Sequence, residues 1–343
     1  MPVTDETISG LRVAVLGNTD PKVYWSTENE YVDAWERNGA IVSRYHEKHP
    51  EDWDRLIVDI QDDHFDLVQW TSTKDFRDAA GRQRQTQLAA ACKNTDTPLA
   101  GVHLDVWIGL EREQNIIDDP WYFIGCDVLF TADGGHDDEW AGYGVNHKWL
   151  LPAISERWLG LGEYTGKWAS DIAFVGSWQG GYHPESEHRH QLVQWLQDTY
   201  GDRVRFWPKK GQPRIVGRDL NDLYASTKVV VGDSCWLPGW KNYCSDRIPE
   251  TAGRGGSLLH PWVEGVNADE HDPFYYACVA GWEMGDWSRL KTLIDGEIDN
   301  AYEPESDMWK SVRQVPLHAI ADAHTYTARC REIVAELIGQ GWL

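Results

Sequence analysis

A short apolar run that ends at a glycine occurs near the start of the chain and again midway along it. The two runs are residues 11–17 (LRVAVLG) and residues 171–176 (DIAFVG). Apolar runs of this length, bounded by glycine, are typical of parallel strands that are buried on both faces of a sheet. Because parallel strands need crossover connections, usually helices, each run predicts the start of a separate α/β unit.

The residues after each run continue the alternation of strands and helices. The further expected strands are residues 40–45, 65–70, 98–103 and 126–131 in the first half, and 204–207, 228–232 and 257–260 in the second. The predicted fold class is therefore α/β, with two parallel-sheet domains. Ligands of open α/β sheets bind at the carboxyl ends of the strands, so we expect the two sheets to face a cleft there.

The length of 343 residues also fits two domains. Residues 1–155 are expected to form the N-terminal domain and residues 171–318 the C-terminal domain. Residues 156–170 are rich in glycine and have no clear hydrophobic period, which predicts a linker. The remaining segment, 319–343, predicts one long helix over 319–339 with an apolar stripe.

The composition excludes several classes of protein. The chain has 55 acidic and 32 basic residues, a formal net charge of -23. This charge argues against a free-standing binder of the DNA backbone and against attraction to an anionic membrane. No apolar stretch approaches the ~18 residues that cross a bilayer, and the N-terminus lacks the apolar core of a signal peptide. None of the six cysteines forms a CxxC pair, so we expect a cytoplasmic protein with reduced thiols.

Two segments of the second half have residues suited to a phosphorylated ligand. Residues 174–181 (FVGSWQGG) are a glycine-rich loop after a strand, which lets a ligand approach the backbone. In residues 244–256 (CSDRIPETAGRGG), Arg247 could clamp a phosphate and Glu250 could accept hydrogen bonds from ribose hydroxyls. An ordinary strand–helix turn and an Arg–Glu surface pair are the alternatives.

The first half offers a candidate general base just past an expected strand, in residues 101–107 (GVHLDVW). His103 and Asp105 lie two residues apart and would share a face at the end of that strand. The alternative is a capping aspartate beside a hydrogen-bonded core histidine.

Metal-binding patterns are weak, and we expect no metal. His183, His188 and His190 cluster without the spacing of a common zinc site. Asp52 and Asp54 form an acidic pair of the kind that holds a divalent metal in some glycosyltransferases. Their place at the start of an expected helix is better explained by N-capping.

Four blocks of the second half, in this order, resemble glycosyltransferases of the GT-B fold, specifically the group related to spore-maturation and spore-coat glycosyltransferase-like proteins. The blocks are DIAFVGS with Arg189 behind it, LNDLYASTKVVVGDS, SDRIPETAGRGGSLL and AHTYTARCREIV. The first half matches only in pattern, through LRVAVLG, PLAGVHLD and CDVLFTAD. The resemblance implies two Rossmann-like domains facing a cleft, with the C-terminal helix crossing back to the first domain.

The resemblance also implies a transfer reaction that uses a nucleotide sugar, such as a UDP-sugar, and no metal. Arg247 would bind the diphosphate and Glu250 the ribose, while His103 or Asp105 would face the acceptor held by the first domain. The other residues expected around the donor are Gly176, Ser177, Lys209, Ser234, Thr251 and Gly253. Arginine, lysine and helix N-termini would stabilise the leaving diphosphate.

Several alternatives stay open. Retaining enzymes of this type often have two acidic residues with seven residues between them; Glu250 fits the second place, but Asn242 occupies the first. An inverting reaction with Asp105 or His103 as the base therefore stays open. The acceptor is a hydroxymethylated base in phage-type DNA, which the net charge disfavours, or a protein, or a small molecule. A sugar-nucleotide epimerase or hydrolase on the same scaffold, and a non-enzymatic sugar-binding protein, are the competing functions. The sequence predicts no oligomeric state.

Overall fold

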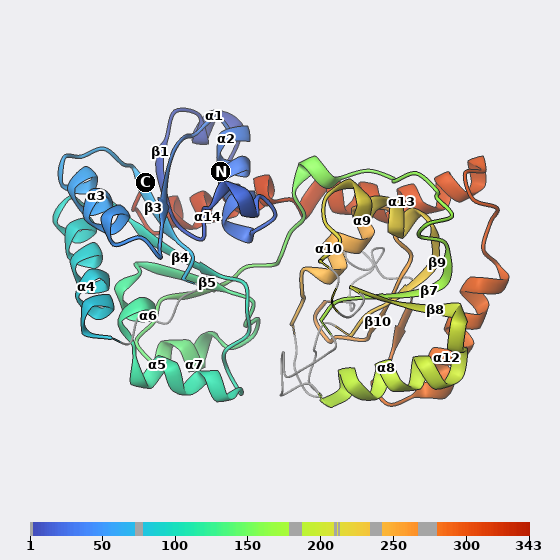
Figure 1. Ribbon diagram of the computed structural model, residues 1–343. Coiled ribbons are helices and arrows are strands. Elements are labelled where there is room, and N and C mark those ends of the chain that lie inside the picture. The colour runs from blue at the N-terminus through green and yellow to red at the C-terminus, as the bar shows by residue number, and fades with distance from the viewer. Residues whose placement is uncertain are drawn as a thin grey trace. The chain divides into compact units, whose positions relative to one another are not determined.

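The computed structural model divides into two compact units (Figure 1). The first unit is formed by Met1–Leu151 together with Tyr326–Leu343, and the second by Pro152–Thr325. Each contains a parallel sheet with helices packed against it, so the predicted α/β fold class is confirmed. The structure describes residues 3–72, 78–177, 187–208, 211, 213–233, 242–266 and 280–343.

The first unit has a six-stranded parallel sheet in the order β2-β1-β3-β4-β5-β6. Its strands are β1 (Arg12–Gly17), β2 (Ile41–His46), β3 (Leu67–Trp70), β4 (Leu99–His103), β5 (Val128–Thr131) and β6 (His147–Trp149). The first five were expected from their apolar runs. β6 was not, because a three-residue edge strand with the sequence HKW has no apolar run.

Helices supply the rest of this unit's core. They are α1 (Asp5–Ile8), α2 (Thr27–Arg37), α3 (Pro50–Gln61), α4 (Ala79–Asn94), α5 (Gln114–Asp118), α6 (Trp121–Gly125), α7 (Asp137–Gly142) and α14 (Tyr326–Gly339). Trp53, Trp70 and Trp140 are almost completely buried in one core cluster that includes the side chains of α3, α4 and α6. Much of the unusual tryptophan content is therefore packing.

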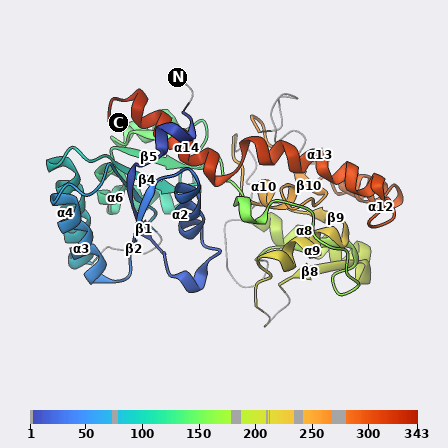
Figure 2. The same cartoon turned by 90° about the horizontal axis from the view of Figure 1, so that it is seen from above.

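The C-terminal helix α14 belongs to the first unit, as the fold class predicted, and it packs beside α2 (Figure 2). Asn38 Nδ2, at the end of α2, donates to the carbonyl oxygen of Thr327 at 3.1 Å. Cys330, Ile333 and Leu337 are fully buried there.

The single helix expected over 319–339 is wrong, because the chain forms two helices. α13 (Asp307–Ala323) ends before His324, and α14 begins at Tyr326. Between them the chain pairs with a distant segment: Ile154 N donates to His324 O at 3.0 Å, and Ile154 forms a parallel bridge with Thr325. This pairing with a distant segment interrupts the helical hydrogen bonds.

The second unit has a five-stranded parallel sheet in the order β11-β10-β9-β7-β8. Its strands are β7 (Ser170–Val175), β8 (Val204–Trp207), β9 (Thr227–Val231), β10 (Leu258–Pro261) and β11 (Ala280–Trp282). The helices are α8 (Glu187–Tyr200), α9 (Arg218–Ala225), α10 (Arg247–Ala252), α12 (Trp287–Asp299) and α13. Its core joins β7, β9 and β10 to α8 and α12.

Residues 156–170, expected to link the domains, belong to the second unit. Asn221 of α9 is fully buried and its Nδ2 donates to the carbonyl oxygens of Trp158 and Gly160, both at 2.8 Å. A side chain at Gly162 would lie 2.2 Å from the Asn221 backbone. The glycines therefore let this segment pack closely on α9. Within the ranges that the structure covers, no helix combines the length and the apolar character needed to cross a membrane.

Candidate functional site

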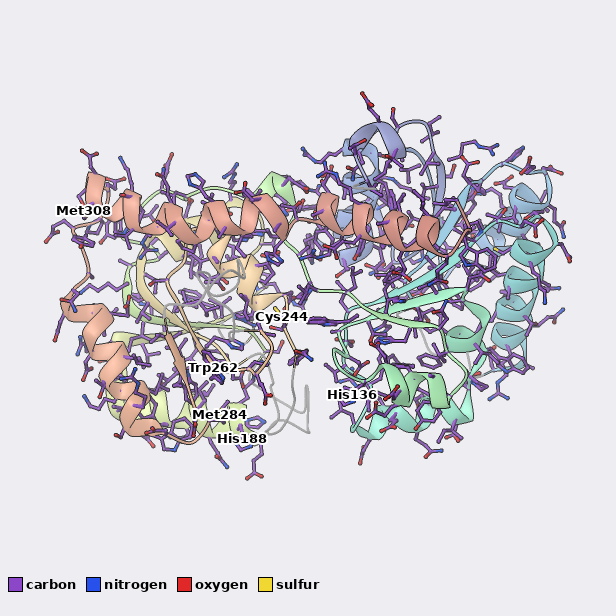
Figure 3. All side chains as sticks on the ribbon, turned by 180° about the vertical axis from the view of Figure 1, so that it is seen from behind. His136, His188, Cys244, Trp262, Met284 and Met308 are labelled. Carbon is purple, nitrogen blue, oxygen red and sulfur yellow. The ribbon has the colours of Figure 1, made fainter. Side chains whose placement is uncertain are left out.

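The carboxyl edge of the second sheet brings together several residues expected to bind a donor. Gly176 directly follows β7, Gly232 follows β9, and α10 begins at Arg247. Because parallel strands end at the same edge, these segments converge there. Figure 3 labels one residue in each of four segments that border this edge, namely Cys244, Trp262, Met284 and His188.

Arg247 lies across the ends of two neighbouring strands. A Cβ at Gly232 would lie 3.2 Å from Arg247 Cγ, and a Cβ at Gly176 would lie 2.5 Å from Arg247 Nη2. Gly176 also has a φ of +154°, which residues with side chains rarely adopt. Both glycines therefore make room for this arginine. Among the described residues, none forms an ion pair with its guanidinium, which leaves the donors available to an anion.

A buried ion pair fixes the backbone next to Arg247. Arg189 of α8 donates to Asp233, which follows β9, through Nε at 2.9 Å and Nη2 at 2.7 Å. Its Nη1 donates to the carbonyl oxygen of Ser177 at 3.0 Å. Both side chains are almost fully buried. The pair thus ties the end of β7 to the end of β9. Asp233 was not predicted as a site residue, although its place after the run KVVVG was a usable signal.

A second residue missed from the sequence is His260 in β10. It is buried, and its Nδ1 lies 2.8 Å from the carbonyl oxygen of Pro261, to which it donates. Burial lowers the pKa of His260 to about 4, with Asp233 opposing and Arg247 adding to the shift. The ring is therefore neutral near pH 7 and adds no positive charge beside Arg247.

Glu250 is anchored by another arginine. Arg254 Nε donates to Glu250 Oε2 at 2.9 Å, and Arg254 Nη1 donates to Asn221 Oδ1 and to the carbonyl oxygen of Gly217. The Glu250 side chain keeps 28% of its surface exposed, whereas Arg254 is buried. This ion pair differs from the Arg–Glu surface pair weighed as an alternative, because its arginine is Arg254 and is buried.

Two of the expected donor residues are occupied by packing inside the second unit. Thr251 is fully buried, and a Cβ at Gly253 would lie 2.9 Å from Ile154 Cδ1. A Cβ at Gly255, where φ is +74°, would lie closer still to Leu161. These glycines admit neighbouring side chains of the same unit. Lys209 and Ser234 lie outside the described residues.

At the carboxyl edge of the first sheet, the structure brings His103 and Asp105 together. His103 Nδ1 lies 3.8 Å from Asp105 Oδ2, and Arg112 Nη1 lies 3.5 Å from the same oxygen. The His103 side chain is 15% exposed and that of Asp105 is 53% exposed. Burial lowers the pKa of His103, although Asp105 partly opposes this. Asp105 is thus the more accessible acceptor of a proton.

The first unit also contains a buried carboxylate that the sequence did not single out. Asp133, just after β5, accepts hydrogen bonds from the backbone nitrogens of Trp107 and Ile108. Those residues follow His103 and Asp105 along the chain. An acidic residue placed right after an apolar strand was the available signal.

Across the part of the chain that the structure describes, no three His, Cys, Asp or Glu side chains are arranged to hold a metal ion. His188 and His190 lie on α8, and His183 is outside the described residues. The expected N-cap at Asp52 is wrong, since His49 occupies that position. Asp52 lies in the first turn of α3 and accepts from His46 N at 2.8 Å.

A cavity of about 610 Å³ opens at the other edge of the second sheet. Its lining includes Ser170, Thr227 and Ser257, at or next to the starts of β7, β9 and β10, with Glu297 and Arg313 from the helices. It therefore lies a strand length away from Arg247.

No family model matches the sequence, and no curated protein matches it. Solved structures share the fold. An alpha-glucosyltransferase in complex with UDP-glucose and DNA containing an abasic site is 10% identical, with a TM-score of 0.64 over 96% of this chain and 100% of that one. Anabaena Alr3699/HepE in complex with UDP-glucose is 11% identical, with a TM-score of 0.54 and the same coverage. A glycosyltransferase from Rickettsia africae ESF-5 is 10% identical, with a TM-score of 0.53 over 95% and 97%.

These likenesses confirm the fold: two parallel-sheet α/β domains of the GT-B type, with the C-terminal helix returning to the first domain. At about a tenth identity they carry fold information alone, because one fold serves many chemistries.

Proposed function

We propose that the protein is a glycosyltransferase that moves a sugar from a nucleotide-sugar donor to an acceptor hydroxyl. The observation that carries this is the placement of Arg247, whose guanidinium lies over Gly176 at the carboxyl edge of the second sheet. A cationic fork at such an edge suits a diphosphate. The solved structures of similar fold include complexes with UDP-glucose, which supports a UDP-sugar as the donor.

In this proposal Arg247 binds the diphosphate and neutralises the charge that builds up on it as the glycosidic bond breaks. Glu250, held in place by Arg254, accepts hydrogen bonds from the ribose hydroxyls. Gly176 and Ser177 line the donor, with Lys209 and Ser234 as further expected contacts. The reaction uses no metal, since the arginine supplies the positive charge.

The first unit binds the acceptor in this proposal. Asp105, half exposed and next to His103, removes the proton from the attacking hydroxyl. Gly253 acts through packing, by letting α10 approach Ile154, and the buried Thr251 packs against Gly256. The acceptor classes to be tested are a hydroxymethylated base in DNA, a protein and a small molecule.

Titration calorimetry with a panel of nucleotides and nucleotide sugars tests the donor site. Arg247→Ala is expected to weaken binding by at least about tenfold, the equivalent of one charge-assisted hydrogen bond. Arg203→Ala is the matched control, because this exposed arginine pairs with Asp171 at the opposite edge of the sheet. Folded wild-type protein that binds none of the panel would refute the proposal.

Product analysis tests the reaction. The protein is incubated with the bound nucleotide sugar and with each acceptor pool, and mass spectrometry follows the mass gained by the acceptor. A donor that changes with no acceptor present, by inversion of a sugar carbon or by hydrolysis, would instead identify an epimerase or a hydrolase.

A further inference from the structure

Asp133 is a buried carboxylate that holds the segment after β4. It is 1% exposed. Its Oδ1 accepts hydrogen bonds from Trp107 N at 2.7 Å and from Ile108 N at 3.1 Å. These two residues directly follow the stretch that contains His103 and Asp105. Removing the carboxylate would leave two backbone donors without an acceptor, and the segment would have to rearrange to satisfy them.

The other oxygen of Asp133 begins a chain of three contacts. Thr131 Oγ1 lies 2.8 Å from Asp133 Oδ2 and 2.9 Å from His147 Nε2, and His147 Nδ1 lies 2.7 Å from Asp137 Oδ1. Each contact joins two electronegative atoms and needs a hydrogen. The threonine hydroxyl supplies one and a neutral imidazole supplies one. The third hydrogen must be an additional proton, held by His147 or by one of the two carboxyl groups, Asp133 and Asp137.

The surroundings shift the pKa values of Asp133 and His147 in opposite directions. Burial raises the pKa of Asp133 to about 6. The hydrogen bonds that Asp133 accepts, and to a smaller extent His136, act in the opposite direction. Burial lowers the pKa of His147, Asp137 raises it, and His136 and Lys148 lower it further. The His147 side chain is buried, whereas that of Asp137 is 69% exposed. A proton that leaves the network therefore reaches water through Asp137.

We propose that Asp133 is a positioning residue for the transfer reaction: it fixes the backbone at Trp107 and Ile108, thereby places His103 and Asp105, and shares one proton with His147 through the Thr131 hydroxyl. The role of Asp133 in catalysis rests on the proposed function, in which His103 and Asp105 face the acceptor. Its role in holding the backbone of Trp107 and Ile108 is independent of that function.

Two substitutions separate placement from charge. Asp133→Ala removes both acceptors. Asp133→Asn keeps the carbonyl oxygen for the two backbone donors, and its amide group can donate to Thr131, which then donates to His147. The asparagine thus completes the contacts without the additional proton. Asp127→Ala is the matched control, because Asp127 also accepts from a backbone nitrogen, that of Leu99 at 2.8 Å, at the opposite end of β4 and β5.

Amide hydrogen exchange, measured residue by residue, is the first readout and needs no activity. Asp133→Ala is expected to speed exchange at Trp107 and Ile108 by at least about tenfold, because both lose their acceptor. Asp133→Asn and Asp127→Ala should leave these two amides near the wild-type rate. Unchanged exchange in Asp133→Ala would overturn the placement.

Turnover is the second readout. Asp133→Ala is expected to lower kcat by about a hundredfold, the usual cost of a misplaced reactive group, with donor affinity unchanged. Asp133→Asn should restore most of kcat, and an NMR pH titration of His147 should lack the shared-proton step that we expect in the wild type. An asparagine variant as slow as the alanine variant, an equal loss in Asp127→Ala, or a titration of His147 unaltered by the asparagine would overturn the inference. Absent nucleotide binding by the wild type would refute the proposed function instead.

Discussion

The position of Arg247 makes the Gly176→Ala variant a sensitive test of the donor site. The added methyl would lie 2.5 Å from Nη2, 3.2 Å from Cζ and 3.3 Å from Nη1 of Arg247. Non-bonded carbon atoms settle at about 3.5 Å or more, so the guanidinium has to move by about 1 Å. A hydrogen bond to a phosphate does not survive such a shift with its geometry intact.

The size of the effect follows from the bonds at stake. A hydrogen bond to a charged group contributes about 1.5–3 kcal/mol. Loss of one such bond raises the dissociation constant for the nucleotide by about tenfold to about a hundredfold. Loss of both arms of a bidentate contact would exceed this range.

Titration calorimetry with UDP measures the effect. Gly166→Ala is the control, since a methyl there meets nothing within 4 Å and the backbone has ordinary dihedrals. The double variant Gly176→Ala with Arg247→Ala should bind no more weakly than Arg247→Ala alone, because both changes remove the same contact. Wild-type affinity in Gly176→Ala, or losses that add in the double variant, would refute the reasoning.

Three further changes probe the second unit. Arg189→Met leaves the buried Asp233 uncompensated and is expected to lower the free energy of unfolding by about 3–5 kcal/mol, measured by urea unfolding; a loss under 1 kcal/mol would contradict the structure. Gly296→Ala should raise the free energy of unfolding by up to about 1 kcal/mol, because Gly296 lies inside α12 and a Cβ there would have no neighbour within 4 Å. A lower midpoint of thermal unfolding would contradict this. Burial would raise the pKa of Asp171, but hydrogen bonds from Lys228 and Arg203 outweigh this and lower it. The ionised Asp171 therefore stabilises the fold above its unfolded-state pKa, and this contribution is lost as the pH falls through its folded-state pKa. In Asp171→Asn the free energy of unfolding should fall less steeply as the pH is lowered. An unchanged pH dependence at low pH would refute this.

The buried strands were predictable from the sequence because burial on both faces leaves a local mark. The run RVAVLG of β1 is apolar almost throughout. By contrast, β11 has the sequence AGW and lies at the edge of its sheet. Its three residues are too few to form an apolar run that would predict a strand. Short edge strands depend on their partners, and their partners are distant in sequence.

In the candidate site, too, residues marked by a local sequence pattern were predictable, and residues whose role depends on distant partners were not. Arg247 was predictable as a candidate because it lies between an apolar strand and a glycine-rich turn, where an arginine can reach a phosphate. The roles of Gly253 and Asp133 were not predictable, because their partners are Ile154 and the backbone of Trp107 and Ile108. A glycine that admits a ligand and one that admits a neighbouring side chain look alike in a sequence.

The discontinuity of the first unit has a consequence for how the protein is made. Its last helix, α14, leaves the ribosome only after the whole of Pro152–Thr325 has been synthesised. Until then α2 lacks the helix that packs beside it, including the Tyr326 ring, which lies edge-on to Tyr31 with the ring centres 4.9 Å apart. The second unit is an uninterrupted segment whose two ends pair through Ile154 and Thr325. It can therefore complete its core first, and the first unit, although it begins the chain, is the last to close.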